Sequence, residues 1–367
     1  MGKNIKIKKW KNSWVHLIIP LLALFLLVIF NLIRDPSFFL IEIKHNNFGN
    51  AVLSGNLISI FNGASELAIL AMGMTLVTAA SGGQDISVGA VAAIAGSVFV
   101  RVLNSNQITI PIIVIAFLAS CVVAMFFGAF NGTLVAIFKI QPMIATLILC
   151  ATGRAIAYWI NGGATPTVSN PVINYLGSFI PGIPVPTPIF TVIICGIIFA
   201  VVLKFTNLGL YAQAVGINEK SARLNGINTV WIKLLVYIIM SICVTVAGTV
   251  SVCRLSLINH ETILLNIEMD TILAVAIGGN ALSGGKFSMV GSVIGAYIIQ
   301  GLTTTLYAMK VSSTDVKAYK AVVIIAIVAI GSPVVKKMTA RLWNMLFQKK
   351  EEFAISKDKE GVSDVES

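Results

Sequence analysis

Two short glycine-rich segments carry polar side chains that could handle a solute. Residues 82–89 and residues 278–285 share the pattern Gly-Gly-x-x-(Ile/Leu)-Ser-x-Gly, and each adjoins long apolar runs. We call them the first and the second glycine box. Glycine lets helices approach closely or lets the backbone leave helix geometry, which a membrane tolerates only where protein covers the break or water reaches it. The residues that we expect to line a solute pathway are Gln84, Asp85, Ser87, Arg154 and Asn280.

Some of these residues have a second interpretation. Asp85 could instead cap the following helix through Ser87 and nearby amides. Arg154 could extend its guanidinium out of the apolar layer, or it could act with Tyr158 and Trp159 as a hydrogen-bond donor and aromatic face for a hydroxyl-rich solute. The sequence leaves these alternatives open.

Catalytic, metal and cofactor chemistry are not indicated. The pair Gly285-Lys286 only approaches a phosphate-binding loop, because Asn280 stands where the first glycine is needed and Phe287 where Ser or Thr should follow. The three histidines are scattered, and the five cysteines lie in apolar runs without CxxC spacing. We expect a protein that is not an enzyme, with no catalytic residue, bound metal or cofactor.

The composition predicts a membrane protein. Hydrophobic residues make up 57% of the 367 residues, charged residues 11%, and the mean hydropathy is +0.91. Since a bilayer core needs about 20 apolar residues per helix, we predict an all-α, polytopic bundle of about ten transmembrane helices with an internal repeat. The predicted spans are 14–33, 56–80, 86–103, 109–138, 142–162, 187–205, 231–253, 269–285, 288–308 and 317–335.

Positive charge predicts the orientation and the domain boundaries. Most of the 26 lysines and arginines fall on one side if the chain starts in the cytoplasm, as the positive-inside rule requires. We therefore expect a cell membrane protein with both termini cytoplasmic: a basic N-terminus (1–13), a transmembrane domain (14–335) and a charged tail (336–367). The net charge of +11 is explained by this topology, so we expect no nucleic-acid partner.

The loop at 206–230 is too polar for the membrane and too long for a minimal connector. Asn218 can cap a short helix and Gly226 can end it, which would present Glu219, Lys220 and Arg223 on the cytoplasmic face. Such a rigid element could be gripped by an attached motor domain, or it could be an ordinary amphipathic loop. The proline-rich segment at 163–187 should instead form a stiff, extended outer surface, which could dock an external partner or could be a rigid connector without one.

Two questions about the architecture stay open. Each glycine box could interrupt one helix or separate two, so the two halves of the repeat could be parallel or inverted. Acidic residues inside the membrane would favour an ion-coupled carrier, and the candidates besides Asp85 are Glu66 and Asp270.

Three ordered motifs carry a family resemblance. Residues 73–89, 214–227 and 276–285 closely resemble the permease subunits of bacterial sugar ABC importers of the ribose/galactose type. Residues 139–149 and 298–301 look most like the galactofuranose-type permease. The sequence departs from the usual pattern at Gln84 and Ser81, which weakens any inference about the sugar.

The resemblance implies partners that the chain lacks. A cytoplasmic ATP-binding-cassette ATPase would grip the loop around Asn218 to Asn225, an extracytoplasmic sugar-binding protein would deliver cargo, and a second permease copy or homologue would complete the pathway. It also implies about ten helices and inverted repeats. We therefore predict a sugar-import permease working by alternating access, with coupling through Asn218, Glu219, Lys220, Arg223 and Gly226; an ion-coupled carrier is the alternative.

Overall fold

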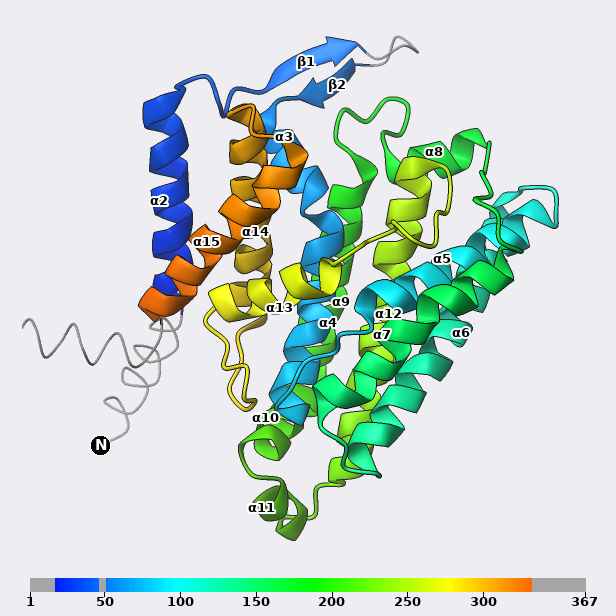
Figure 1. Ribbon diagram of the computed structural model, residues 1–367, viewed down its shortest axis with the longest axis vertical. Helices are drawn as coiled ribbons and strands as arrows, with labels where there is room; N and C mark the ends of the chain where they lie inside the picture. The colour runs from blue at the N-terminus through cyan, green and yellow to red at the C-terminus, as the bar shows by residue number, and fades with distance from the viewer. Residues whose placement is uncertain (1–16, 46–50, 332–367) are drawn as a thin grey trace, which may run out of the picture. The chain divides into compact units, whose positions relative to one another are not determined.

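The computed structural model describes residues 17–45 and 51–331, and these form mainly helices (Figure 1). The elements are α2 (Ile18–Arg34), β1 (Glu42–His45), β2 (Ala51–Ser54), α3 (Asn56–Gly63), α4 (Ser65–Ser81), α5 (Val88–Asn104), α6 (Ile110–Ala136), α7 (Pro142–Ile160), α8 (Pro171–Gly177), α9 (Thr187–Phe205), α10 (Leu208–Ile217), α11 (Glu219–Leu224), α12 (Thr229–Leu255), α13 (Ile267–Ile277), α14 (Met289–Ala308) and α15 (Ser313–Gly331). The chain forms two units. The first ends at Lys320, and the described part of the second is the rest of α15. The predicted terminal segments, 1–13 and 336–367, lie outside the described residues.

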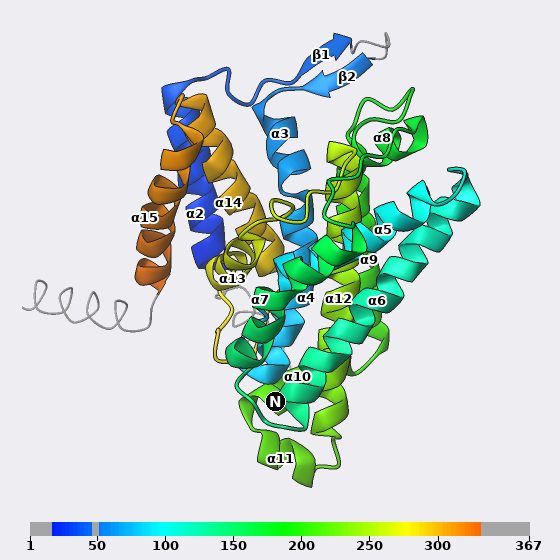
Figure 2. The same ribbon diagram turned by 45° about the vertical axis from the view of Figure 1, so that its right-hand side comes forward.

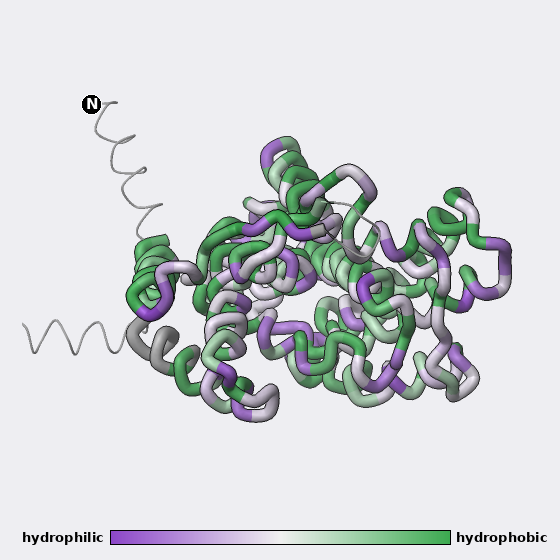
Figure 3. Tube along the Cα trace, turned by 90° about the horizontal axis from the view of Figure 1, so that it is seen from above, coloured by the Kyte–Doolittle hydropathy of each residue, from purple (hydrophilic) through white to green (hydrophobic). Residues whose placement is uncertain are grey.

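Six helical segments of the described chain are long and apolar enough to cross a bilayer. They are Asn56–Ser81, which comprises α3 and α4, and the helices α6, α7, α9, α12 and α14. Hydrophobic residues follow much of the helical path in Figure 3. The protein is therefore a multi-pass membrane protein, as the composition predicts.

Helix α4 is the core of the first unit. Every residue from Ser65 to Ala80 is buried, which is typical of a helix that is apolar on all sides and covered by protein. It packs against α9, α10, α12, α13 and α14. In contrast, only 28% of the apolar window of α6 and 17% of that of α9 is buried, so each helix has an apolar face that lipid can cover.

The predicted span at 269–285 is corrected by the structure. Helix α13 has 11 residues and ends at Ile277, whereas about 20 are needed to cross a bilayer. The chain leaves helix geometry at the second box, where Gly279 has a φ of +80°. The first box likewise follows the end of α4, where Gly82 adopts the left-handed conformation. Both boxes therefore separate two helices instead of interrupting one.

Two elements were not predicted. Strands β1 and β2 form an antiparallel hairpin in which Glu42 pairs with Ser54, so the fold is not entirely α. The proline-rich segment is not uniformly extended, because it contains α8, which Pro171 begins and the side chain of Asn170 caps. The amide of Leu53 donates to the carbonyl of Pro184 (2.9 Å), which joins the hairpin to this segment. Figure 2 shows the hairpin and α8 at the same end of the first unit.

Candidate functional site

The two glycine boxes lie in direct contact although 196 positions separate them. Gln84 Nε2 donates to the carbonyl of Leu282 (2.9 Å), and the amide of Gly285 donates to the carbonyl of Ala79 (3.0 Å). A Cβ on Gly82 would lie 3.0 Å from the carbonyl oxygen of Ser283. The absence of side chains at the glycines therefore lets the two breaks pack against each other.

In the first box, Asp85 and Ser87 organise the start of α5. Asp85 Oδ1 accepts hydrogen bonds from the amide (2.8 Å) and the hydroxyl (2.6 Å) of Ser87. Ser87 Oγ also accepts from Asn131 Nδ2 on α6 (2.9 Å), and all three residues are buried. Asp85 therefore fixes the turn at Ser87, just before α5, and accepts no bond from an amide within that helix. A role for Gln84, Asp85 and Ser87 in lining a pathway stays a prediction.

In the second box, Asn280 fastens three helices together. Its Nδ2 donates to Ser292 Oγ of α14 (2.7 Å) and to the carbonyl of Val275 in α13 (3.1 Å), while its Oδ1 accepts from the amide of Ser288. Ser292 Oγ accepts in turn from Thr75 Oγ1 of α4 (2.6 Å). The side-chain amide of Asn280 therefore joins the end of α13 to the start of α14 across the second glycine box. A role for Asn280 in lining a pathway stays a prediction.

Arg154 of α7 donates hydrogen bonds to three backbone carbonyls. Its Nη1 donates to the carbonyls of His260 (2.7 Å) and Glu261 (3.0 Å), and its Nη2 donates to the carbonyl of Ile263 (3.2 Å). These carbonyls belong to the loop that connects α12 with α13. Trp159 is 77% exposed, so it does not form a closed pocket with the guanidinium.

Two acidic residues considered from the sequence have basic partners. Glu66 Oε1 lies 3.1 Å from Arg254 Nη1, and Asp270 Oδ2 lies 2.7 Å from Lys320 Nζ. A third acidic residue, Glu268 in the first turn of α13, was not predicted from the sequence. Its side chain is buried, and Oε2 accepts no hydrogen bond from any described residue. Its place in the sequence did not indicate that it is buried, because it lies at the edge of a predicted membrane span, where acidic residues are commonly exposed to water.

The predicted coupling loop folds as two short helices, α10 and α11. Asn218 Oδ1 caps α11 by accepting from the amide of Ser221 (3.0 Å), and Gly226, with a φ of +80°, follows its end, as the sequence predicts. Glu219 accepts from Lys233 Nζ of α12 (2.7 Å) and from Arg223 Nη2 (3.3 Å). The position of α11 is therefore fixed by an ionic cluster.

The surface around α11 also carries apolar residues that sequence reasoning missed. Leu224 is 89% exposed and Ile217 is 64% exposed. A groove of about 730 Å³ lies beside α11, and its lining consists of Lys139, Ile217, Asn218, Glu219, Lys220, Arg223 and Leu224. Lys139 belongs to the connection between α6 and α7, so two connections contribute to one surface. Large exposed aliphatic side chains beside charged ones are typical of a protein docking surface.

Acidification should lower the protection of the α11 amides from hydrogen exchange, and the pH at which this happens should depend on Lys233. The hydrogen bond from Lys233 is the largest of several causes that hold the pKa of Glu219 below its ordinary value of 4.5. A lowered carboxyl pKa stabilises the fold at neutral pH, and this stabilisation disappears as the pH falls through the lowered value. Lys233→Met should raise that pKa, so that amides 219–226 lose protection from hydrogen exchange at a higher pH, after correction for intrinsic rates. Lys220→Met, at an exposed lysine of the same helix, is the control, and equal profiles for the two variants would contradict the assignment.

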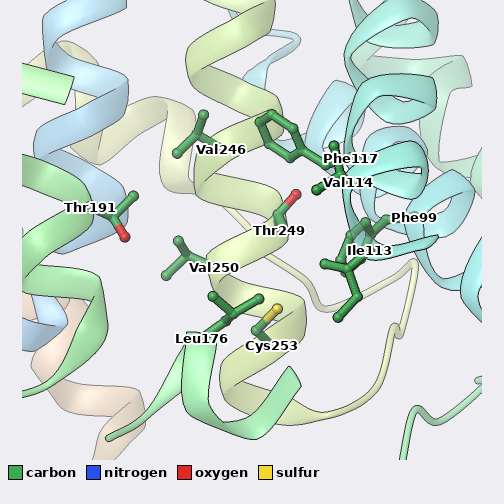
Figure 4. A pocket seen from close by; sticks show the side chains of 10 residues that line it. All are labelled: Phe99, Ile113, Val114, Phe117, Leu176, Thr191, Val246, Thr249, Val250 and Cys253. Atoms are coloured by element: carbon green, nitrogen blue, oxygen red, sulfur yellow. The ribbon is translucent and has the colours of Figure 1, made fainter. Parts of the chain in front are cut away.

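A second cavity has a different character. It lies between α5, α6, α8, α9 and α12, has a volume of about 300 Å³, and is lined almost entirely by apolar side chains (Figure 4). The lining residues are Phe99, Ile113, Val114, Phe117, Leu176, Thr191, Val246, Thr249, Val250 and Cys253. Two hydroxyls in an apolar wall offer few hydrogen bonds to a polar solute, so this cavity is not our candidate site.

The structure indicates a multi-pass helical membrane protein in which two glycine-rich breaks between helices touch each other, with a groove beside α11. Comparison with known proteins gives the family. The family described as branched-chain amino acid transport system / permease component matches residues 56–331, and the chain belongs to it. The chain is therefore a permease component, which confirms the class that the motifs predicted.

Relatives span almost the whole chain. It is 36% identical over 328 residues to the galactofuranose transporter permease protein of Escherichia coli (strain K12), covering 88% of this chain and 92% of the relative. It is 34% identical over 349 residues to the fructose import permease protein of Bifidobacterium longum (strain NCC 2705), covering 93% and 94%. It is 35% identical over 327 residues to the ribose import permease protein of Escherichia coli (strain K12), covering 88% and 95%. No solved structure matches the chain.

Proposed function

We propose that this protein is the permease subunit of an ATP-binding-cassette importer that moves a sugar into the cell by alternating access. The observation that carries the proposal is the similarity over most of the chain to permeases named for galactofuranose, fructose and ribose. The three relatives are named for different sugars at nearly equal identity. The sugar is therefore assigned only as a class of small, polyhydroxylated solutes.

The partners follow from the surfaces. A cytoplasmic ATPase docks on α11 and the groove beside it, where Leu224 and Ile217 supply apolar area and Lys220 supplies an exposed charge. Glu219 and Arg223 hold the shape of this surface through their mutual contact. An external sugar-binding protein docks on the end formed by the hairpin and α8, and a second permease copy or homologue completes the pathway.

The proposed topology has ten crossings with both termini cytoplasmic. The crossings are α2, α3 with α4, α5, α6, α7, α9, α12, α13 with its preceding loop, α14 and α15. In this topology both glycine boxes lie on the cytoplasmic side, which agrees with their direct contact. The boxes then repeat in parallel, whereas the family resemblance implied inverted repeats.

Uptake by cells distinguishes this function from the ion-coupled alternative. Cells that express the chain with its ATPase and binding protein are supplied with labelled D-ribose, D-fructose or D-galactose. We expect uptake of one of these sugars. Uptake should stop when the catalytic residues of the ATPase are disabled. It should continue when an ionophore removes the ion gradient while ATP is maintained. Uptake that follows the ion gradient and ignores the ATPase would favour the alternative. The ion pairs of Glu66 and Asp270 argue against ion coupling, because two of the acidic residues that could bind the coupling ion already have basic partners.

A further inference from the structure

Glu268 is a carboxylate that lacks a hydrogen-bond partner within the membrane domain. Its residue is 8% exposed, and its Oε2 is buried and accepts no hydrogen bond from the residues at 17–45 and 51–331. It lies in the first turn of α13, which packs against α4 and α5. Figures 1 and 2 both show α13 beside the middle of α4, far from either end of that helix.

Three polar atoms pack closely around Gly89 beside this carboxylate, and we call this arrangement the cradle. The position that a Cβ of Gly89 would occupy lies 2.8 Å from Glu268 Oε2, 2.9 Å from the carbonyl oxygen of Leu264 and 3.1 Å from Arg154 Nη2. Two acceptors and one guanidinium donor therefore surround a residue without a side chain. Glu268 and Arg154 are close, yet they form no ion pair among those found in the described chain.

Leaving this carboxylate without a partner is costly, because a buried acceptor that loses its hydrogen bond bears the full desolvation penalty. The buried carboxylates of Glu66 and Asp85 do have partners, Arg254 and Ser87. Ionisable groups inside a membrane are expensive and commonly mark a solute pathway. The missing partner of Glu268 is therefore best supplied by a solute.

The chemistry of the cradle selects the class of solute. The carboxylate and the carbonyl both accept hydrogen bonds, so they favour a molecule with several hydroxyl donors and disfavour an anion. The guanidinium of Arg154 disfavours a cation and can donate to a hydroxyl or ring oxygen. A neutral, polyhydroxylated molecule satisfies all three groups.

We propose that Glu268 is a specificity-determining residue, which accepts a hydrogen bond from one sugar hydroxyl as the sugar passes the cradle formed with Gly89 and Arg154. This inference rests on the proposed function and adds to it the group that selects the sugar within the permease. Arg154, whose guanidinium is anchored by the carbonyls of the preceding loop, positions the cradle.

Import of deoxy sugars tests the inference. The complete transporter, in proteoliposomes with ATP inside and saturating binding protein outside, is supplied with the sugar among D-ribose, D-fructose and D-galactose that it imports fastest, and with each singly deoxygenated derivative. The unaltered complex should import one derivative at least about tenfold more slowly than the parent sugar, since a hydrogen bond to a charged acceptor is lost. In Glu268→Gln this ratio should fall toward one, because an amide oxygen is a weaker acceptor. The binding protein is identical in both complexes, so a change in the ratio arises in the permease.

Two further variants separate selection from a structural role. Asp315→Asn makes the same kind of change, from carboxylate to amide, at an exposed position of α15, and its ratios should equal those of the unaltered complex. Gly89→Ala keeps the carboxylate of Glu268 but adds a methyl group that must displace it, because the two would lie 2.8 Å apart. It should reduce the discrimination as Glu268→Gln does, and it gives a second test if the Glu268 variant fails to assemble.

The outcomes are distinct. The role of Glu268 is overturned if the ratio of parent-sugar import to deoxy-sugar import is the same in the unaltered complex and in both cradle variants. It is also overturned if those variants import all derivatives more slowly by the same factor. Either result leaves the proposed function standing. No ATP-dependent import of any of the three sugars by the unaltered complex would contradict the proposed function and this inference with it.

Discussion

Replacing Leu224 by aspartate should separate the permease from its ATPase while the permease itself stays folded. Leu224 is 89% exposed at the end of α11, so it contributes little to the fold of its own chain. If the ATPase covers it, the variant loses the burial of a leucine and adds a charge to the interface. The expected loss is about 2 kcal/mol or more, or about 30-fold in affinity. Affinity is measured by titrating the purified ATPase onto the permease in nanodiscs.

Leu40→Asp is the matched control for this variant. Leu40 is also highly exposed, at 62%, but it precedes the hairpin at the proposed outer end. This variant should bind the ATPase as the unaltered chain does. If the Leu224 variant and the unaltered chain bind the ATPase with equal affinity, α11 is not part of the interface. Our assignment of α11 as the element that couples the ATPase to import would then be wrong.

Replacing Gly295 by alanine should destabilise the membrane domain more than most single changes. Gly295 lies where α14 meets α13, and a Cβ there would lie 2.1 Å from the carbonyl oxygen of Ala274, so the helices must move apart. Such overpacking costs about 1–3 kcal/mol, and occasionally more when backbone must shift. Helix separation would also strain the bonds of Asn280 that join α13 and α14. The expected result is a lower thermal unfolding temperature and a smaller yield of monodisperse protein in detergent.

Gly196→Ala makes the same change on a helix where space is available. A Cβ at Gly196 in α9 would meet no atom within 4 Å. Alanine is also the better helix former, by about 1 kcal/mol in a helix interior. The control should therefore keep or raise the unfolding temperature. A Gly295 variant as stable as the control would show that α13 and α14 do not need their close approach.

The sequence predicted the features that depend on local composition. Apolar runs located the six helical segments that are long enough to cross a bilayer, because each such segment must close its backbone hydrogen bonds within itself. The ends of α11 at Asn218 and Gly226 were predicted for a similar reason, since caps involve residues three or four positions apart. The break at the second box was signalled by its glycines, although the predicted span continued through it to residue 285.

Features that depend on distant partners were not predictable from one sequence. The contact of Gln84 with Leu282 and the bonds from Arg154 to the carbonyls near His260 join residues more than 100 positions apart. Glu268 was missed because its isolation is a property of the packed structure, in which Glu66 finds a partner and Glu268 does not. The hairpin was missed because strands of four residues give almost no periodic signal.

In our proposal this chain forms the sugar pathway and takes its energy from a separate ATPase. The most direct measurement is uptake of labelled sugar into proteoliposomes that contain either the chain alone or the chain assembled with its ATPase, with binding protein outside and ATP inside in both. The account predicts accumulation against a gradient in the assembled sample and none with the chain alone. Accumulation by the chain alone, driven by an imposed ion gradient, would contradict it.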